Sequence, residues 1–187
     1  MNKFKIGTLE FFPALSRPEL LAAPVRDALG LRNDSSVEVA AIDASLSDTA
    51  TFCEAYQVTT AEVANCVILE AKQGSTRSYA ACVVLGNTRA DVNGLVKKTL
   101  QVRKVSFAGM ELAVAMTKME YGAITPIGLP HDWPIFIDTR VATSAHVIIG
   151  SGMRGSKLAV TGAVLAALPN VRVLEGLGLD KSVYGMS

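Results

Sequence analysis

The sequence has few of the residues that usually bind metals or form disulfides. Its cysteines, Cys53, Cys66 and Cys82, are an odd number without a C-x-x-C spacing, and the last two lie in apolar runs. A thiol in such a run behaves as a small buried hydrophobe, so neither a zinc site nor a disulfide is expected. His131 and His146 have no third ligand nearby in the sequence. We therefore predict no metal and no other cofactor.

Long apolar runs and a secretory signal are also missing. No apolar stretch approaches the roughly 20 residues that span a bilayer, and the first residues lack the unbroken apolar core of a signal peptide. We therefore expect a cytoplasmic protein with no membrane partner. With 187 residues, of which 50% are hydrophobic, the chain is long enough to form one domain with a sizeable core.

The net charge is only +1, which argues against a protein that coats nucleic acid. The charges are nevertheless unevenly distributed. Residues 1–71 contain five basic and ten acidic side chains, whereas residues 72–118 contain eight basic and two acidic ones. This asymmetry indicates either a basic face for a polyanion or an ordinary solvated surface of helices and turns.

The spacing of apolar residues predicts short helices that alternate with short strands. Helices are expected from Ser16 towards Leu29 with a bend at Pro24, after a cap at Ser47, and at 91–100, 110–116 and 161–168. Strands are expected at 37–42, 63–71, 79–85, 102–107, 135–137, 147–149, 158–160 and 171–174. The last dozen residues are expected to fray. The pattern favours an α/β (mixed α+β) domain around one mixed, curved sheet.

A segment rich in glycine and proline, residues 117–138, precedes one of these strands. It contains two glycines and three prolines. Glycine allows close backbone approach and positive φ, and proline fixes φ near −65°. Together they hold backbone amides and carbonyls rigidly. The segment is therefore either a structural loop or the wall of a functional site.

Conventional catalytic motifs are absent from the sequence, since it has no G-x-S-x-G elbow, Walker loop or dinucleotide fingerprint. The run from Gly150 to Gly155 is glycine-rich, but it leads into a strand rather than a helix. Its glycines could let the backbone approach a ligand or another strand. Arg154 and Lys157 could bind phosphate or simply be solvated.

The order of segments resembles one family. VANCVILEA, YAACVVLG, DVNGLVKK, KVSFA, TKMEYGAITPIG, PIFID and GSGMR follow one another, as in the YbaK-like aminoacyl-tRNA deacylases and the editing domain of prolyl-tRNA synthetase. The resemblance covers about residues 58–175. Its most specific match is the G-x-x-x-P motif from Gly122 to Pro126, followed by Gly128. A strand ending in Asp138 and the late glycines Gly150 and Gly152 complete it.

The resemblance implies a curved, partly barrel-like sheet surrounded by short helices. Residues 58–187 would form the editing unit, and residues 1–57 an extension packed on the same domain. The implied function is hydrolysis of mischarged aminoacyl-tRNA, bound by its 3′ end, with no cofactor. A non-catalytic module that binds tRNA or an aminoacyl or nucleotide ligand is the alternative. Both a monomer and a homodimer stay open.

The resemblance also implies a set of site residues. A positioned water would attack the ester, and backbone amides near Gly122–Gly128 and Gly150–Gly152 would stabilise the oxyanion. The implied catalytic residues are Asn65, Gly122, Thr125 and Pro126. The implied substrate-binding residues are Lys118, Tyr121, Gly128, Asp138, Gly150, Ser151, Gly152 and Arg154.

Asn65 stands where the family has a lysine, in a short A-K-[ST]-L run. Lys72 lies seven residues later and cannot simply replace that lysine. Asn65 could orient the substrate in an altered site, the fold could serve to bind something else, or the asparagine could close a hydrogen bond at the strand end. Lys118 is a second departure, because many relatives have glycine there. Its charge could lie at the mouth of the pocket or point into water.

Overall fold

The computed structural model describes residues 4–32 and 35–181. Its strands are β1 (Phe4–Ile6), β2 (Leu9–Pro13), β3 (Glu38–Ala41), β4 (Ala64–Gln73), β5 (Thr76–Leu85), β6 (Thr88–Ala90), β7 (Lys104–Phe107), β8 (Ile135–Asp138), β9 (Val147–Gly150), β10 (Ser156–Val160), β11 (Val171–Leu174) and β12 (Gly178–Asp180). Its α-helices are α1 (Ala23–Arg32), α2 (Thr49–Tyr56), α3 (Lys97–Leu100), α4 (Met110–Thr117), α5 (Thr139–Ala142) and α6 (Gly162–Ala166). In this part of the chain, no helix has the length and apolar character needed to cross a membrane.

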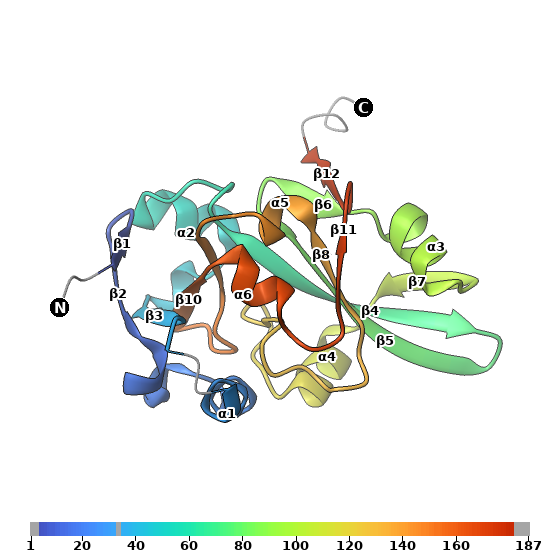
Figure 1. Ribbon diagram of the computed structural model, residues 1–187, viewed down its shortest axis with the longest axis horizontal. Coiled ribbons are helices and arrows are strands. Elements are labelled where there is room, and N and C mark those ends of the chain that lie inside the picture. The colour runs from blue at the N-terminus through green and yellow to red at the C-terminus, as the bar shows by residue number, and fades with distance from the viewer. Residues whose placement is uncertain (1–3, 33–34, 182–187) are drawn as a thin grey trace.

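The strands form two five-stranded sheets and a small two-stranded one (Figure 1). The first sheet has the order β1-β2-β3-β10-β9, and the second has the order β11-β8-β5-β4-β7. In the second sheet β5, β8 and β11 run parallel, whereas β4 is antiparallel to both its neighbours. An isolated bridge between Val63 and Ile148 links the two sheets. The mixed α/β class with a curled sheet is confirmed, although the expected single sheet is divided in two.

The β4–β5 hairpin is central because both of its faces are buried. Ile68 and Val83 face the largest apolar core, together with Trp133 from the Gly/Pro segment. Leu69 and Cys82 face a second core under α3. Since successive side chains of a strand point to opposite faces, two buried faces produce the nearly continuous apolar runs seen in the sequence.

Residues before position 58 pack into the same body as the rest. β3 pairs with β10, with Val39 opposite Leu158. Phe11 and Phe52 share a third core with Ile148 of β9. β10 therefore lies between β3 and β9. The division of the chain at residue 58 stays a prediction.

The first predicted helix begins later than expected. Residues 14–16 and 18–20 form separate 3₁₀ turns, and α1 starts only at Ala23. Leu21 is extended, and the amide of Ala22 donates to the carbonyl of Ser151 at 3.2 Å, which interrupts any continuous helix. Pro24 then occupies the first turn of α1, where its missing N–H costs nothing.

Other local predictions also differ from the structure. The cap of α2 is Asp48 rather than Ser47, and its carboxylate accepts from the amide of Ala50 at 3.1 Å. Residues 92–96 form a π-helical turn before α3. Strands β1, β2, β6 and β12 were not expected. β12 pairs with β6, so residues 178–180 do not fray, while residues 182–187 lie outside the described residues.

Candidate functional site

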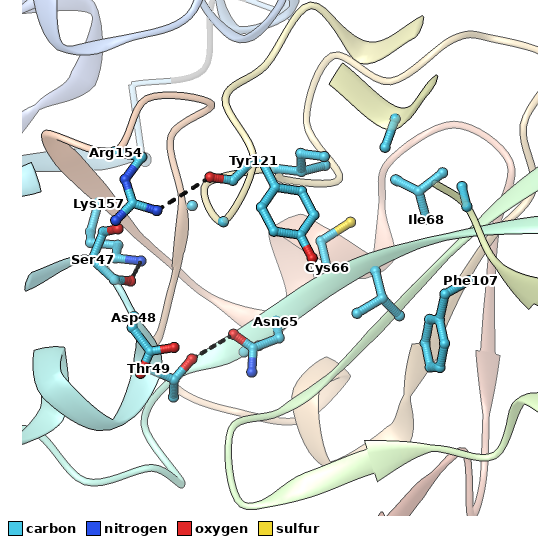
Figure 2. A pocket seen from close by; sticks show the side chains of 17 residues that line it. Ser47, Asp48, Thr49, Asn65, Cys66, Ile68, Phe107, Tyr121, Arg154 and Lys157 are labelled. Atoms are coloured by element: carbon cyan, nitrogen blue, oxygen red, sulfur yellow. Dashed lines mark hydrogen bonds between the residues drawn. The ribbon is translucent and has the colours of Figure 1, made fainter. Parts of the chain in front are cut away.

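A pocket of about 420 Å³ opens between the start of β4, the loop before α2, the loop after α4 and the β9–β10 connection (Figure 2). Its volume lies in the usual range for small-molecule sites. Segments far apart in the sequence meet here because β9 is bridged to the residue before β4 and pairs with β10. The pocket therefore lies where the two large sheets join.

Asn65 and Cys66 line the pocket from the start of β4. The hydroxyl of Thr49 donates to Oδ1 of Asn65 at 3.0 Å (Figure 2). This bond fixes the orientation of the amide and leaves its NH₂ group as a donor. Burial raises the pKa of the Cys66 thiol far above its ordinary value, so this thiol stays protonated and is a poor nucleophile.

Gly122 forms another wall, with Tyr121 beside it at the mouth. Gly122 has φ +82°, and a Cβ there would lie 3.0 Å from Nη1 of Arg154. The Tyr121 side chain is 56% exposed. Across from this loop, a Cβ at Gly150 would lie 2.2 Å from the carbonyl oxygen of Ala123. Glycine at position 150 therefore lets the end of β9 touch the loop.

Two cations occupy the wall formed by β10 and the turn before it. Lys157 is only 6% exposed, its Nζ donates to the carbonyl of Ser47 at 3.1 Å, and it lies 5.2 Å from the ring centroid of Phe52. Burial, reinforced by the charge of Arg154, lowers the pKa of Lys157 to about 8. Arg154 donates to the carbonyls of Ala44 and Tyr121 at 3.1 and 3.5 Å. The solvated alternative for Lys157 is therefore wrong.

The structure brings only part of the predicted site to this pocket. Its lining contains Asn65, Tyr121, Gly122, Gly150 and Arg154. The predicted residues absent from the lining are Lys118, Thr125, Pro126, Gly128, Asp138, Ser151 and Gly152.

Most of the residues outside the lining are used in packing. Thr125 and Pro126 are buried in the loop, and Gly128, at φ +84°, lies against the carbonyl of Pro24. Ser151 shares a hydrogen bond of 2.7 Å with the hydroxyl of Ser156. Lys118 and Gly152 line a separate hollow of about 520 Å³.

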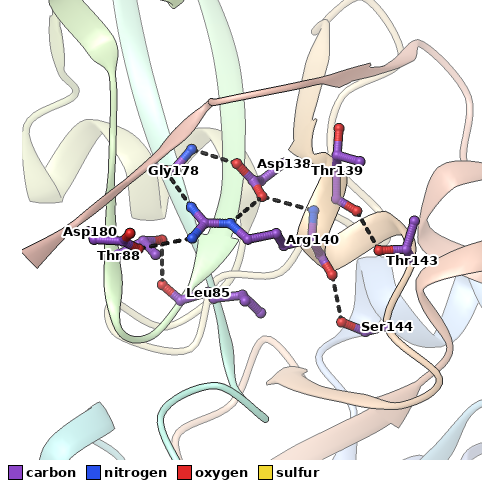
Figure 3. A network of polar contacts seen from close by, with 9 residues as sticks. All are labelled: Leu85, Thr88, Asp138, Thr139, Arg140, Thr143, Ser144, Gly178 and Asp180. Carbon is purple, nitrogen blue, oxygen red and sulfur yellow. Dashed lines mark hydrogen bonds and ion pairs between the residues drawn. The ribbon is translucent and has the colours of Figure 1, made fainter.

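Asp138 is the centre of a polar network away from the pocket (Figure 3). Its carboxylate is 2% exposed and accepts from the amide of Gly178 at 2.6 Å and from Nε of Arg140 at 3.1 Å. It also caps α5 through the amide of Arg140. Arg140 in turn contacts Asp180 at 2.9 Å. These contacts tie β8 to β12, and they occupy the carboxylate for which we had predicted a role in substrate binding.

Sequence reasoning missed the segment that faces Lys157. Ser47, Asp48 and Thr49 all line the pocket. The only signal in the sequence was the helix start at this position, which we interpreted as a cap alone. The contact of Ser47 with Lys157 depends on β10 being paired beside β3, and no local pattern encodes that pairing.

A row of basic side chains crosses the sheet beyond the pocket. Lys72 of β4 stands opposite Arg77 on one side and Lys104 on the other. Glu70 pairs with Lys72 at 3.2 Å and with Arg77 at 2.9 Å. The row lies on the same face of β4 as Cys66, because even-numbered positions share a face. Like charges directly opposite one another are unfavourable, and Glu70 offsets part of that repulsion. Whether the row meets a polyanion or is simply solvated stays a prediction.

Comparison with known proteins identifies the family. A family model described as the aminoacyl-tRNA editing domain matches residues 43–168. This range includes the loop before α2, the start of β4, the Gly122 loop and both cations. The chain belongs to the aminoacyl-tRNA editing domain family. The predicted YbaK-like resemblance is thereby confirmed.

Solved structures share the fold of this editing domain. One is a protein proposed to be a trans-editing enzyme for prolyl-tRNA synthetase, with a TM-score of 0.70 and 19% identity; the match covers 82% of this chain and 94% of that one. Another is a hypothetical protein with a TM-score of 0.73 and 17% identity; the match covers 83% of this chain and 99% of that one. A third, described as a signal transduction protein of Marinobacter aquaeolei VT8, has a TM-score of 0.58 and 19% identity. That match covers 87% of this chain and 32% of the other one. No curated protein sequence matches the chain.

Proposed function

We propose that this editing domain hydrolyses mischarged aminoacyl-tRNA in the pocket at the start of β4, as a trans-editing deacylase. The observation that carries the proposal is a pocket of about 420 Å³, lined by both polar and apolar residues, inside the matched family range. Its walls offer amide and ammonium donors and no histidine. This arrangement suits a reaction that needs positioning and charge stabilisation more than a strong nucleophile.

The ester of an aminoacyl-tRNA is already activated, so an oriented water can attack its carbonyl carbon. The pocket lining contains no hydroxyl or thiol paired with a histidine, and burial keeps Cys66 protonated. Within the described chain, the backbone amides of Gly122 and Ile124 donate to no protein acceptor. These amides are our candidates for the oxyanion donors, a role that typically contributes a factor of about 10²–10³ to the rate.

Asn65 is our candidate for orienting the substrate. The hydroxyl of Thr49 already donates to its carbonyl oxygen, so the NH₂ group is left to donate a hydrogen bond to the substrate. Asp48, also in the lining, supplies a carboxylate for the α-ammonium group of the bound amino acid. Neither role requires a cofactor.

The proposed partner is the 3′ end of an aminoacyl-tRNA. The basic row of Lys72, Arg77 and Lys104 supplies positive charge for the phosphate backbone. From Cys66 to Lys72 the distance along β4 is about 20 Å, at roughly 3.3 Å per residue. A single-stranded 3′ end can cover that length.

The alternative is a module that binds an aminoacyl or nucleotide ligand without hydrolysing it. It is kept because Asn65 stands where the resemblance implies a lysine. Deacylation assays with a panel of mischarged tRNAs distinguish the two functions. Hydrolysis of at least one substrate well above its spontaneous rate supports the deacylase, whereas salt-dependent tRNA binding without turnover supports the module. Failure to bind tRNA at low salt contradicts both.

A further inference from the structure

Lys157 is a buried charge with little compensation inside the protein. It is 6% exposed, and its ammonium has one carbonyl acceptor, Ser47, and one aromatic face, Phe52. Within residues 4–32 and 35–181, no carboxylate lies within 4.0 Å of its Nζ. Burying an ammonium group that lacks a charged partner is costly. An ammonium has three donors, so Lys157 retains donors for a ligand in the pocket that it lines.

Arg154 adds a second positive charge to the same wall (Figure 2). Both side chains line the same pocket, and the charge of Arg154 contributes to the lowered pKa of Lys157. Its guanidinium is anchored by the carbonyls of Ala44 and Tyr121, and both are neutral acceptors. Asp48 and Glu120 are the acidic residues near the pair, and both are exposed: Asp48 caps α2, and the carboxylate of Glu120 accepts from the backbone amide of Arg154 at 2.5 Å. Among the described residues, neither carboxylate forms an ion pair with the two cationic side chains. Two neighbouring cations thus share a wall with little neutralising charge.

We propose that Arg154 and Lys157 form a phosphate site in the pocket wall, and that the site binds the phosphate on the 5′ side of the terminal adenosine of tRNA. The inference rests on the proposed function, since that function supplies the nucleotide. An anion between the two cations relieves their repulsion and takes the unused donors of Lys157. The α-ammonium group of the amino acid is repelled from this wall. The aminoacyl ester is therefore directed towards Asn65 and Gly122.

Two non-hydrolysable probes test the site in binding experiments on the whole protein. Both are 3′-aminoacylamido-adenosines, one with a 5′-phosphate and one without. We expect the wild type to bind the phosphorylated probe at least about tenfold more tightly than the unphosphorylated one, the gain expected from one charge-assisted hydrogen bond. In Lys157→Met this preference falls to about twofold or less. Lys157→Arg retains it, and so does Lys5→Met, a control lysine paired with Glu10 on the surface.

The pH dependence of the wild type tests the same site without any substitution. A phosphate monoester is largely ionised above pH 7, so its charge is constant there. The pKa of Lys157 is lowered to about 8, and the preference for the phosphorylated probe should fall as the pH rises through that value. The other charged or titratable groups around Lys157 are Arg154, Asp48, Glu120 and the thiol of Cys53, whose pKa is raised by burial. In Lys157→Arg the preference should persist above pH 9.

The outcomes separate this inference from the proposed function. An unchanged preference in a folded Lys157→Met variant, or an equal loss of affinity for both probes, overturns the phosphate site. A wild type whose preference does not change between pH 7 and 9 overturns it as well. Wild-type protein that prefers the phosphorylated probe but hydrolyses no mischarged tRNA contradicts the deacylase and supports the phosphate site.

Discussion

Asn65 is the residue on which the proposed chemistry most depends. Its amide is oriented by Thr49 and lines the pocket. We expect Asn65→Ala to reduce single-turnover deacylation by about 10²-fold, as for loss of one oriented donor. Asn65→Asp is the matched control, because it keeps the shape and removes the NH₂ donor, so it should be similarly impaired. Asn65→Lys is expected to raise the rate.

The melting temperatures of these variants separate chemistry from folding. Asn65 is partly buried and its side chain makes one hydrogen bond, so its loss should cost only about 1 kcal/mol of stability. A deacylation rate unchanged in Asn65→Ala would place the chemistry elsewhere in the pocket.

Asp138 is expected to matter for stability and not for catalysis. Asp138→Ala leaves the amide of Gly178 and the guanidinium of Arg140 without their buried acceptor. We expect a loss of about 2–4 kcal/mol in the free energy of unfolding, measured with urea. Asp180→Ala is the control: it removes a partner that is 56% exposed and should cost less than about 1 kcal/mol. A selective loss of substrate affinity in Asp138→Ala, without destabilisation, would contradict this account.

At the scale of elements, Gly150 tests whether β9 and the Gly122 loop must touch. A methyl group at Gly150 would lie 2.2 Å from the carbonyl oxygen of Ala123, so the strand and the loop must separate. We expect Gly150→Ala to lose more than about 2 kcal/mol of stability and most of the activity. Gly30→Ala, in α1, where an added Cβ would have no atom within 4 Å, should instead stabilise the protein by about 0.5–1 kcal/mol. Thermal unfolding of both variants checks this, and equal effects would contradict it.

The basic row is tested by its effect on tRNA binding. Lys72→Gln and Lys104→Gln each remove one charge from adjacent strands. If the row contacts phosphates, each substitution should weaken tRNA binding and reduce the slope of log K against log salt by about one. Arg172→Gln, at an exposed position on β11, is the control and should leave the slope unchanged. Identical slopes in all three variants would favour the solvated alternative.

Elements with strong local patterns could be predicted from the sequence. The β4–β5 hairpin was evident because its two apolar runs flank a polar turn, and α4 and β8 were found near their observed positions. β6 and β12 were missed, since three-residue strands that pair with a distant part of the chain leave no periodic signal. The 3₁₀ turns before α1 were missed because the hydrogen bond from Ala22 to Ser151 is a tertiary contact.

The candidate site could be predicted only in part, for the same reason. Gly122, Gly150 and Asn65 belong to motifs whose order is readable along the chain. Lys157 and the loop from Ser47 to Thr49 meet only because β10 pairs with β3. Asp138 follows a buried strand, which drew attention to it, but its partner Gly178 lies in a strand that the sequence did not reveal.

At the scale of the whole molecule, the pocket depends on both large sheets. One sheet supplies Asn65 from β4, and the other supplies Lys157 from β10 and Gly150 from β9. β10 is in turn held by β3, so the segment before residue 58 supports the wall that carries the cations. An editing function therefore requires the two sheets to stay joined at the bridge between Val63 and Ile148.

The most direct test of the central claim is single-turnover hydrolysis of a panel of mischarged tRNAs by the wild type and by Asn65→Asp. Our account predicts that the wild type hydrolyses at least one aminoacyl-tRNA well above the spontaneous rate, and that Asn65→Asp, with an unchanged melting temperature, loses most of that acceleration. No acceleration for any substrate, at protein concentrations where tRNA is bound, would contradict it.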